Sequence, residues 1–354
     1  MGFLLDIMFT NSIDIIDIKS WKVSFFWKLP LCLSLCMVWA VSGCQSGAEH
    51  ASSDKARASR VSSLRGRISV SGAFALYPLM VRWSEEFRAL HPKVRIDISA
   101  GGAGKGITDV LSGMVDLGMV SREIYPEELA RGIVPVAVAL DAVVVATSAS
   151  NPVLDELMIR GISRQAATDL WVRGASKTWG DVLHSEAIAP VHVYSRSDAC
   201  GAAETWAHFL GVRQEDLRGV GVFGDPGAAS AVLKDPVSLG YNNMAYVYDP
   251  DTRRPYPGMA VVPLDLDGNG SIGPEERSYD SLDSLMSAIS SGRYPSPPAR
   301  ALYLVMKGVP RDTALRTFLR FLLTQGQKYA PETGFVPLAQ SVAEQQLRIL
   351  EDKR

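Results

Sequence analysis

Cysteine is scarce in this chain, and most of it lies near the N-terminus. Of the four cysteines, three are found in the first 44 residues, so Cys200 is the single cysteine of the rest of the chain. No disulfide can form within that remainder. A chain of 354 residues, 47% of them hydrophobic, needs no such crosslink, because it is long enough to bury the cores of two packed lobes.

The sequence also lacks an excess of positive charge. It holds 36 Lys and Arg against 38 Asp and Glu, which gives a formal net charge of −2. No run of basic residues is interleaved with aromatic residues, the pattern that would follow a nucleic-acid backbone. The composition therefore argues against a protein that binds nucleic acid.

Signatures of catalysis and of histidine-based metal sites are missing after residue 44. The chain contains no Gly-x-Ser-x-Gly, His-Glu-x-x-His or Cys-x-x-Cys there. His184, His192 and His208 have no metal-ligand spacing. Cys200 and His208 fall about 80° apart around the axis of a helix, so the histidine is badly placed to activate the thiol. We therefore expect a protein that catalyses no reaction.

The N-terminal segment has no apolar run long enough to span a bilayer. Residues 29–40 are apolar and follow several lysines, which suits the core of a secretion signal. The run ends in Val41-Ser42-Gly43-Cys44, which resembles the lipobox of bacterial lipoproteins, and this resemblance implies a lipid on Cys44. A plain membrane anchor and a signal cleaved without lipid are the alternatives.

This leader predicts where the protein is located. Residues 1–44 would be a lipoprotein signal peptide and 45–65 a flexible tether, because 45–63 are polar, rich in Ser and Ala, and free of hydrophobic periodicity. We expect an exported protein that is held at a membrane by its lipid. It would face the periplasm or the cell exterior.

Glycine marks three places where a strand is expected to turn into a helix. These turns lie at 71–78, 101–106 and 196–203, each between a short strand-like segment and a helical pattern. The first amide groups of a helix have no partner within it and attract anions. Helix starts that meet in one cleft would replace the water around an anion with fixed N–H dipoles.

The glycine-rich turn at 101–106 fits neither of the common nucleotide-binding loops. A P-loop would need Gly where Ser99 stands, and Ser or Thr where Gly106 follows Lys105. The dinucleotide fingerprint Gly-x-Gly-x-x-Gly is one residue longer than the glycine pattern of 102–106. A helix start for a small anion and a turn that merely needs positive φ both stay open.

Arg196 is the charged residue expected at the centre of an anion site. It closes a strand, and Asp198, two residues later, can orient its guanidinium. Gly201 then opens a helix with free amide groups. We interpret 194–206 as one half of an oxyanion clamp.

A series of motifs in a fixed order resembles one known family. The chain is similar to the phosphate-binding proteins of bacterial phosphate ABC importers over about residues 66–345. The motifs that carry this resemblance are 71–78 (SGAFALYP), 101–106 (GGAGKG), 115–122 (VDLGMVSR), 151–153 (NPV), 177–181 (KTWGD), 196–198 (RSD), 239–241 (LGY) and 302–305 (LYLV).

The resemblance implies a fold and a set of partners. The fold would be the α/β, two-lobed, type II periplasmic-binding-protein fold, in which each lobe is a mixed sheet flanked by helices and the ligand cleft lies between the lobes. Lobe 1 would span 66–147 and 254–354, and lobe 2 would span 148–253. The nearly continuous apolar run at 134–148, broken by Asp141, independently predicts buried hinge strands between the lobes. The ligand would be phosphate or a similar oxyanion, the partners would be ABC permease subunits, and the protein would be a monomer.

The resemblance also implies which positions bind the anion. They are Ala73, Phe74, Ala103, Gly104, Ser121, Arg196, Asp198, Cys200, Gly201 and Ala202. The family usually has hydroxyl residues in the first loop and at three further positions, where this chain has Ala73, Phe74, Ala103, Cys200 and Ala202. Each hydrogen bond lost to a charged group is worth about 1.5–3 kcal/mol.

Two interpretations of these missing hydroxyls stay open. Backbone amides, Arg196 and Ser121 can suffice for phosphate, or the ligand is larger and more apolar, which Phe74 would suit. Another oxyanion, an organophosphate, a sensory role without transport and a hydrolase are the alternative functions.

Residues 265–276 match the calcium loop Asp-x-Asp-x-Asn-Gly-x5-Glu at every position. The preceding segment is strand-like, so a paired EF-hand is not expected, and a hydrophilic surface turn is the alternative. Gly270 would make the bend and Ile272 would point inward. The ligands of a structural calcium would be Asp265, Asp267, Asn269, the carbonyl of Ser271 and Glu276.

Overall fold

The structure, a computed structural model, describes residues 64–351. These residues belong to one compact unit. The predicted leader with Cys44, and almost all of the predicted tether, lie outside the described residues. No helix within 64–351 is long and apolar enough to cross a membrane.

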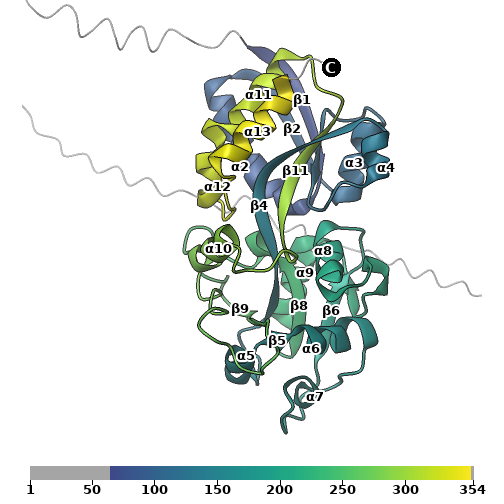
Figure 1. Cartoon of the computed structure of the whole chain (residues 1–354), viewed down its shortest axis with the longest axis vertical. Coiled ribbons are helices and arrows are strands. Elements are labelled where there is room, and N and C mark those ends of the chain that lie inside the picture. The colour runs from purple at the N-terminus through teal and green to yellow at the C-terminus, as the bar shows by residue number, and fades with distance from the viewer. Residues whose placement is uncertain (1–63, 352–354) are drawn as a thin grey trace, which may run out of the picture. The chain divides into compact units, whose positions relative to one another are not determined.

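The strands of this unit form one long mixed sheet (Figure 1). The strand order is β2-β1-β3-β11-β4-β8-β6-β7, and β9 also pairs with β4, while β5 and β10 form a separate pair. β1 is parallel to β2 and β3, whereas β4 and β11 are antiparallel to each other. The strands are β1 (Arg65–Gly72), β2 (Lys93–Ala100), β3 (Leu117–Val120), β4 (Ile133–Ser148), β5 (Ile162–Ser163), β6 (His192–Arg196), β7 (Val220–Val222), β8 (Ser238–Asn243), β9 (Met259–Val262), β10 (Leu264–Asp265) and β11 (Ala299–Lys307).

Helices cover the strands in both halves of the sheet. In the first half, α2, α11 and α13 lie on one side of the strands, and α3 and α4 lie on the other (Figure 1). The helices are α2 (Tyr77–Leu90), α3 (Ala103–Leu111), α4 (Pro126–Ala130), α5 (Leu154–Arg160), α6 (Arg164–Thr168), α7 (Trp179–Leu183), α8 (Gly201–Leu210), α9 (Gly224–Lys234), α10 (Leu282–Ser291), α11 (Thr313–Leu323), α12 (Tyr329–Glu332) and α13 (Gln340–Glu351).

Two hydrophobic cores define two lobes. The first lobe is built around Trp83, Phe87 and Phe318, and the second around Trp171 and Trp206, all with an exposed fraction of 0%. The rings of Trp171 and Trp206 pack edge to face with their centroids 5.2 Å apart. The tryptophans therefore fill the core, as their helical context indicates.

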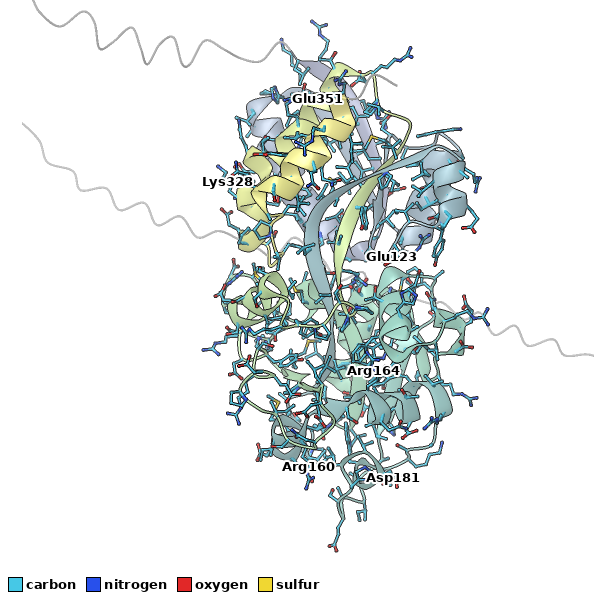
Figure 2. The ribbon with its side chains drawn as sticks, viewed as in Figure 1. Glu123, Arg160, Arg164, Asp181, Lys328 and Glu351 are labelled. Carbon is cyan, nitrogen blue, oxygen red and sulfur yellow. The ribbon has the colours of Figure 1, made fainter. Side chains whose placement is uncertain are left out.

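Charged side chains lie on the outside of both lobes. Lys328 and Glu351 are exposed on the first lobe, and Arg160 and Asp181 on the second (Figure 2). This distribution follows from the cost of taking a charge out of water without a partner. Buried charges are therefore exceptions that need a reason, and most of them lie where the lobes meet.

β4 and β11 carry the chain between the lobes. On β4 the first core ends at Ala139 and the second begins at Ala142. On β11 Ala299 belongs to the second core and Leu302 to the first. β4 is buried along most of its length, which agrees with the hinge strand expected within 134–148.

The packing differs from the division of lobes expected from the sequence. That expectation puts 254–298 in lobe 1, yet β9 and α10 pack into the core of the second lobe. The reason is that β9 pairs with the second-lobe half of β4, where Val262 lies opposite Val145. The chain returns to the first lobe only at β11, which agrees with the family motif at 302–305. On β4 the change of core comes at Asp141, before residue 147.

Candidate anion site

Loops from the two lobes meet at glycines. Gly201, the first residue of α8, lies against Ser121, which follows β3 in the first lobe. A Cβ on Gly201 would come 2.2 Å from the hydroxyl oxygen of Ser121, and one on Gly102 would come 3.0 Å from the carbonyl oxygen of Ala199. The turns at 101–106 and 196–203 are therefore neighbours, and a larger residue at 201 would push the lobes apart.

The turn at 71–78 reaches the second lobe at the same junction. The hydroxyl of Tyr246 donates to the carbonyl of Phe74 at 2.9 Å. The ring of Phe74 meets that of Phe223 edge on, with centroids 6.2 Å apart, and lies 3.6 Å from the position of a Cβ on Gly224. Ala73 beside it is buried. Phe74 thus packs against an aromatic side chain of the opposite lobe.

Two helices begin at this junction with free amide groups. α3 begins at Ala103 and α8 at Gly201, and no side chain caps either start. The first amides of a helix have no partner within it and can bind an anion. A Cβ on Gly104 would meet no atom within 4 Å, so the start of α3 borders open space. The amides of Gly104 and Ala202 are therefore candidate donors.

Arg196 is buried between two carboxylates at the end of β6. Its side chain has an exposed fraction of 0%. Nε and Nη2 donate to the two carboxylate oxygens of Asp198 at 2.9 and 2.7 Å, a forked pairing through which Asp198 orients the guanidinium. Nη1 lies 3.2 Å from Oδ1 of Asp225 and makes no hydrogen bond within the described residues. One guanidinium donor is therefore left for a further acceptor.

Asp225, on the first turn of α9, is the second carboxylate beside Arg196. Burial alone would lower the pKa of Arg196, but the carboxylates of Asp225 and Asp198 outweigh it and raise that pKa. Burial raises the pKa of Asp225, and the neighbouring Arg196 opposes this rise. The amide of Asn243 donates to Oδ1 of Asp225, and that of Asn242 donates at 2.9 Å to its carbonyl oxygen. The side chain of Asp225 is thus fixed beside Arg196.

Cys200 occupies one of the positions where the family usually has a hydroxyl. The residue is buried, and burial raises the pKa of its thiol to about 12, so the sulfur stays protonated at neutral pH. A neutral thiol is only a weak donor. Gln214 braces this loop, since its Oε1 accepts from the amide of Cys200 at 3.2 Å and its Nε2 donates to the carbonyl of Asp198 at 3.0 Å.

An ion pair joins the lobes beside the anion site. Nε of Arg122, from the first lobe, lies 3.3 Å from a carboxylate oxygen of Glu204 on α8, and the hydroxyl of Tyr125 donates to the same carboxylate. Arg122 is held in place by Glu128 at 2.6 Å. A cavity of about 960 Å³ opens here, and its lining includes Ala103, Gly104, Arg122, Tyr125, Cys200 and Glu204.

The structure brings the predicted anion-binding positions to one junction. Those from the first lobe are Ala73, Phe74, Ala103, Gly104 and Ser121, and those from the second are Arg196, Asp198, Cys200, Gly201 and Ala202. Ser121 touches Gly201, and Gly102 lies next to Asp198 and Ala199. Binding by these residues stays a prediction, because their positions alone do not identify a ligand.

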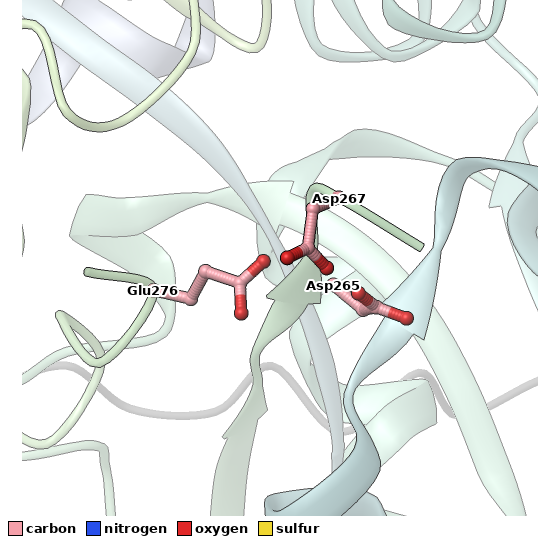
Figure 3. A group of neighbouring side chains, drawn as sticks. All are labelled: Asp265, Asp267 and Glu276. Atoms are coloured by element: carbon pink, nitrogen blue, oxygen red, sulfur yellow. The ribbon is translucent and has the colours of Figure 1, made fainter. Parts of the chain in front are cut away.

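The loop at 265–276 gathers three carboxylates. Oxygens of Asp265, Asp267 and Glu276 lie within 4.8 Å of one another, and Figure 3 shows the three side chains together. Asp265 and Glu276 are buried, with exposed fractions of 4% and 9%. Within the described residues no ion pair reaches any of the three. The amide of Ile272 donates at 2.8 Å to the carbonyl of Ile159, which holds the loop against α5.

A family model described as a PBP superfamily domain matches residues 51–325. This chain belongs to the PBP superfamily. As a member of that superfamily it has the expected two-lobed α/β fold, in which β4 and β11 join the lobes. The expected periplasmic-binding-protein fold is thereby confirmed.

Several relatives of this PBP-superfamily chain are named phosphate-binding proteins. The phosphate-binding protein PstS of Pseudomonas aeruginosa is 28% identical over 310 residues, which cover 82% of this chain and 89% of that protein. PstS of Methanocaldococcus jannaschii is 24% identical over an alignment of 377 positions, which covers 89% of this chain and 93% of that protein. The crystal structure of a putative phosphate ABC transporter substrate-binding protein from Clostridium perfringens, with bound phosphate, has a TM-score of 0.63 at 22% identity and covers 77% of this chain and 100% of that one.

Sequence reasoning missed five charged residues of this junction: Arg122, Asp141, Glu204, Asp225 and Arg300. A usable signal existed for Asp225, because Gly224-Asp225-Pro226 follows the short strand β7 and forms a fourth strand-to-helix turn. No local signal marks Glu204 or Arg300, whose partners come from distant parts of the chain.

Proposed function

We propose that this PBP-superfamily protein captures phosphate between its two lobes and delivers it to the permease of an ABC importer. One observation carries the proposal. The fully buried guanidinium of Arg196 lies at the junction where helix starts from both lobes meet, and its Nη1 forms an ion pair with Asp225 but no hydrogen bond within the described residues. The names and structures of the relatives support the same ligand.

The donor set suits a small tetrahedral oxyanion. Amide groups at two helix starts and one guanidinium are directional donors, and the burial of the guanidinium strengthens its contact with an anion. Ser121 is the hydroxyl residue of the predicted set that remains, so backbone amides replace the hydroxyls missing at Ala73, Ala103 and Cys200. The role is binding without catalysis.

A phosphate ester is the second candidate ligand. The cavity of about 960 Å³ borders Ala103, Gly104 and Cys200, and its volume lies in the range that holds drug-sized ligands. A phosphate group at the helix starts could therefore carry an organic group into that cavity. Tighter binding of a phosphomonoester than of inorganic phosphate would favour this ligand.

Truncation of Arg196 tests the proposed function. Arg196→Ala should weaken phosphate binding at least ~100-fold, because a desolvated anion loses its main counter-charge. Arg196→Lys should recover only part of the affinity, since an ammonium cannot make the forked contact with Asp198. Titration calorimetry of the purified protein with phosphate measures both variants, and thermal melts verify that they fold.

Arg213→Ala is the matched control for this experiment. Arg213 carries the same charge near the same cavity, but its side chain is 81% exposed, so its loss should leave phosphate affinity almost unchanged. Equal binding by wild type and Arg196→Ala would show that Arg196 is not the anion-binding charge.

The lipid on Cys44 and the monomeric state belong to the proposal. The apolar run 29–40 and the lipobox-like ending 41–44 support lipidation of Cys44. Cys44→Ser should abolish labelling with a radioactive fatty acid and release the protein from the membrane fraction. Labelling that persists in this variant would exclude Cys44 as the lipid site.

A structural calcium in the 265–276 loop is the remaining part of the proposal. Two observations support it: the complete sequence match, and three carboxylates that converge without a cation from the described residues. Three carboxylate side chains with amide and carbonyl oxygens are the donors that Ca²⁺ prefers. The ion would fix the loop that follows β10 and would take no part in capturing the anion.

A further inference from the structure

Arg300 lies at the point where the chain crosses between the lobes. It is the second residue of β11, and in the register of the sheet it stands directly opposite Asp141 of β4. Asp141 has an exposed fraction of 0%, and the Arg300 side chain is 8% exposed. Two opposite charges are therefore buried side by side on the two strands that join the lobes.

The guanidinium of Arg300 holds three elements at once. Nη1 donates to the carbonyl of Gly201 at 2.6 Å and to Oγ1 of Thr205 at 2.7 Å, which lie one turn apart at the start of α8. Nη2 donates to Oδ2 of Asp141 at 3.2 Å and to Oδ1 of Asn243, the last residue of β8. A residue of the crossing strand thus anchors the helix start that offers amides to the anion.

The contacts of Arg300 continue to the anion-binding arginine. The side-chain amide of Asn243 donates to Oδ1 of Asp225, and the same oxygen lies 3.2 Å from Nη1 of Arg196. The polar chain therefore runs without a break from the crossing strands to Arg196. The start of α8 and Arg196, the two second-lobe parts of the anion site, both depend on Arg300 for their position.

Stability alone does not account for this ion pair. Oδ1 of Asp141 and Nε of Arg300 are buried without a hydrogen-bond partner in the described part of the chain. In a buried ion pair with unsatisfied atoms, the attraction between the charges rarely offsets the free energy lost on desolvation. An apolar pair between β4 and β11 would avoid that loss. The pair is better explained by what it positions.

We propose that Arg300 is a positioning residue of the anion site, which sets the placement of α8 and Arg196 from the strands that cross between the lobes. The inference rests on the proposed function, because α8 and Arg196 form the second-lobe half of the proposed phosphate site. Nη1 and Nη2 of Arg300 donate to protein acceptors, so the proposal assigns Arg300 no contact with the anion. Its role is to make anion affinity depend on the geometry of the crossing strands.

The decisive variants separate positioning from stability. Arg300→Met should lower the melting temperature, because the buried Asp141 carboxyl loses its counter-charge and donor, and should weaken phosphate binding at least ~10-fold. The double variant Asp141→Asn with Arg300→Met removes both charges and should recover most of the melting temperature. Its phosphate affinity should stay as low as that of Arg300→Met, because α8 and Asn243 still lack their donor.

Two further variants sharpen the comparison. Arg300→Lys keeps the charge but cannot reach all three elements, so its affinity should lie between those of wild type and Arg300→Met. Arg320→Met removes one positive charge from an exposed ion pair with Glu351 and should bind phosphate like wild type. Affinity that recovers together with stability in the double variant, or that is unchanged in Arg300→Met, would overturn the proposal.

A measurement without ligand keeps this inference separate from the proposed function. Amide hydrogen exchange of the ligand-free protein should be faster at the start of α8 in the double variant than in wild type, with α11 unchanged as the internal reference. If wild type bound no phosphate, the proposed function would fail, and this exchange experiment would still decide the role of Arg300. Equal exchange in α8 would overturn it.

Discussion

The fold buries the ionisable residues Asp141, Arg196 and Asp225, whose exposed fractions over the whole residue, backbone included, are 0%, 8% and 2%. Charged residues are rarely buried unless they are paired, and each of these has an opposite charge within 3.2 Å. Their burial gives the site a guanidinium that water and salt do not screen. A buried donor of this kind binds an anion more strongly than an exposed one.

The pH dependence of stability should report the burial of Asp141. Burial raises its pKa to about 6, and Arg300 only partly opposes this rise. Because the pKa in the folded protein exceeds the unfolded value of about 3.9, the stability contributed by Asp141 is fully present below pH ~4 and is lost as the pH rises through ~6. Asp141→Asn should remove this loss, which is on the order of 2–3 kcal/mol.

Urea unfolding at several pH values between about 4 and 7 measures this effect as the difference between wild type and Asp141→Asn. Asp283→Asn is the control, because Asp283 is exposed, its pKa is lowered by Arg253, and it stays ionised across this range. Its difference from wild type should be flat with pH. A flat difference for Asp141→Asn as well would show that the Asp141 pKa is not raised.

The helix starts of the site are the elements that the sequence predicts best. Each depends on local signals, a short strand followed by glycine and a helical pattern. The structure begins α8 at Gly201, as expected, and begins α3 at Ala103, within the turn expected at 101–106. The forked pair of Arg196 with Asp198 is also local, because the two residues are two positions apart. Local chemistry of this kind can be read from the sequence without knowing the fold.

Contacts between distant segments could not be predicted in the same way. Arg300 meets Asp141 only because β11 and β4 pair in one register, and Glu204 meets Arg122 only because the lobes come together. The placement of β9 in the second lobe likewise depends on its pairing with β4, which no local pattern specifies. The family resemblance supplied the fold, but the lobe boundary and the buried charges needed the structure.

The calcium loop is the element whose prediction is simplest to test. Extracellular calcium modules bind with dissociation constants of roughly 10⁻⁴–10⁻³ M, so ~10 mM calcium should raise the melting temperature by a few degrees over chelator. Glu276→Gln should remove this increment, because it takes away the bidentate ligand. Differential scanning calorimetry measures the shift.

Glu275→Gln is the matched control for the loop, since Glu275 is the exposed neighbour of Glu276 and loses the same charge. It should keep the calcium increment. A wild-type melt that is identical in calcium and in chelator would mean that the loop is a hydrophilic turn.

At the scale of the whole molecule, direct contacts hold the two lobes together at the site. The hydroxyl of Tyr246 binds the backbone of Phe74, and Glu204 pairs with Arg122. Two strands, β4 and β11, join the lobes, and we expect any closure to be a hinge motion about them. An anion that contacts both lobes would favour the closed arrangement by the difference between its affinities for the closed and open states.

Calorimetric titration of the purified wild-type protein with phosphate, and with sulfate as the control anion, tests the central claim most directly. Phosphate at neutral pH keeps an O–H group that can donate a hydrogen bond to a carboxylate beside Arg196, whereas sulfate has no such donor. The account predicts saturable binding of one phosphate per chain and far weaker binding of sulfate. Absence of phosphate binding, or equal affinity for sulfate, would contradict it.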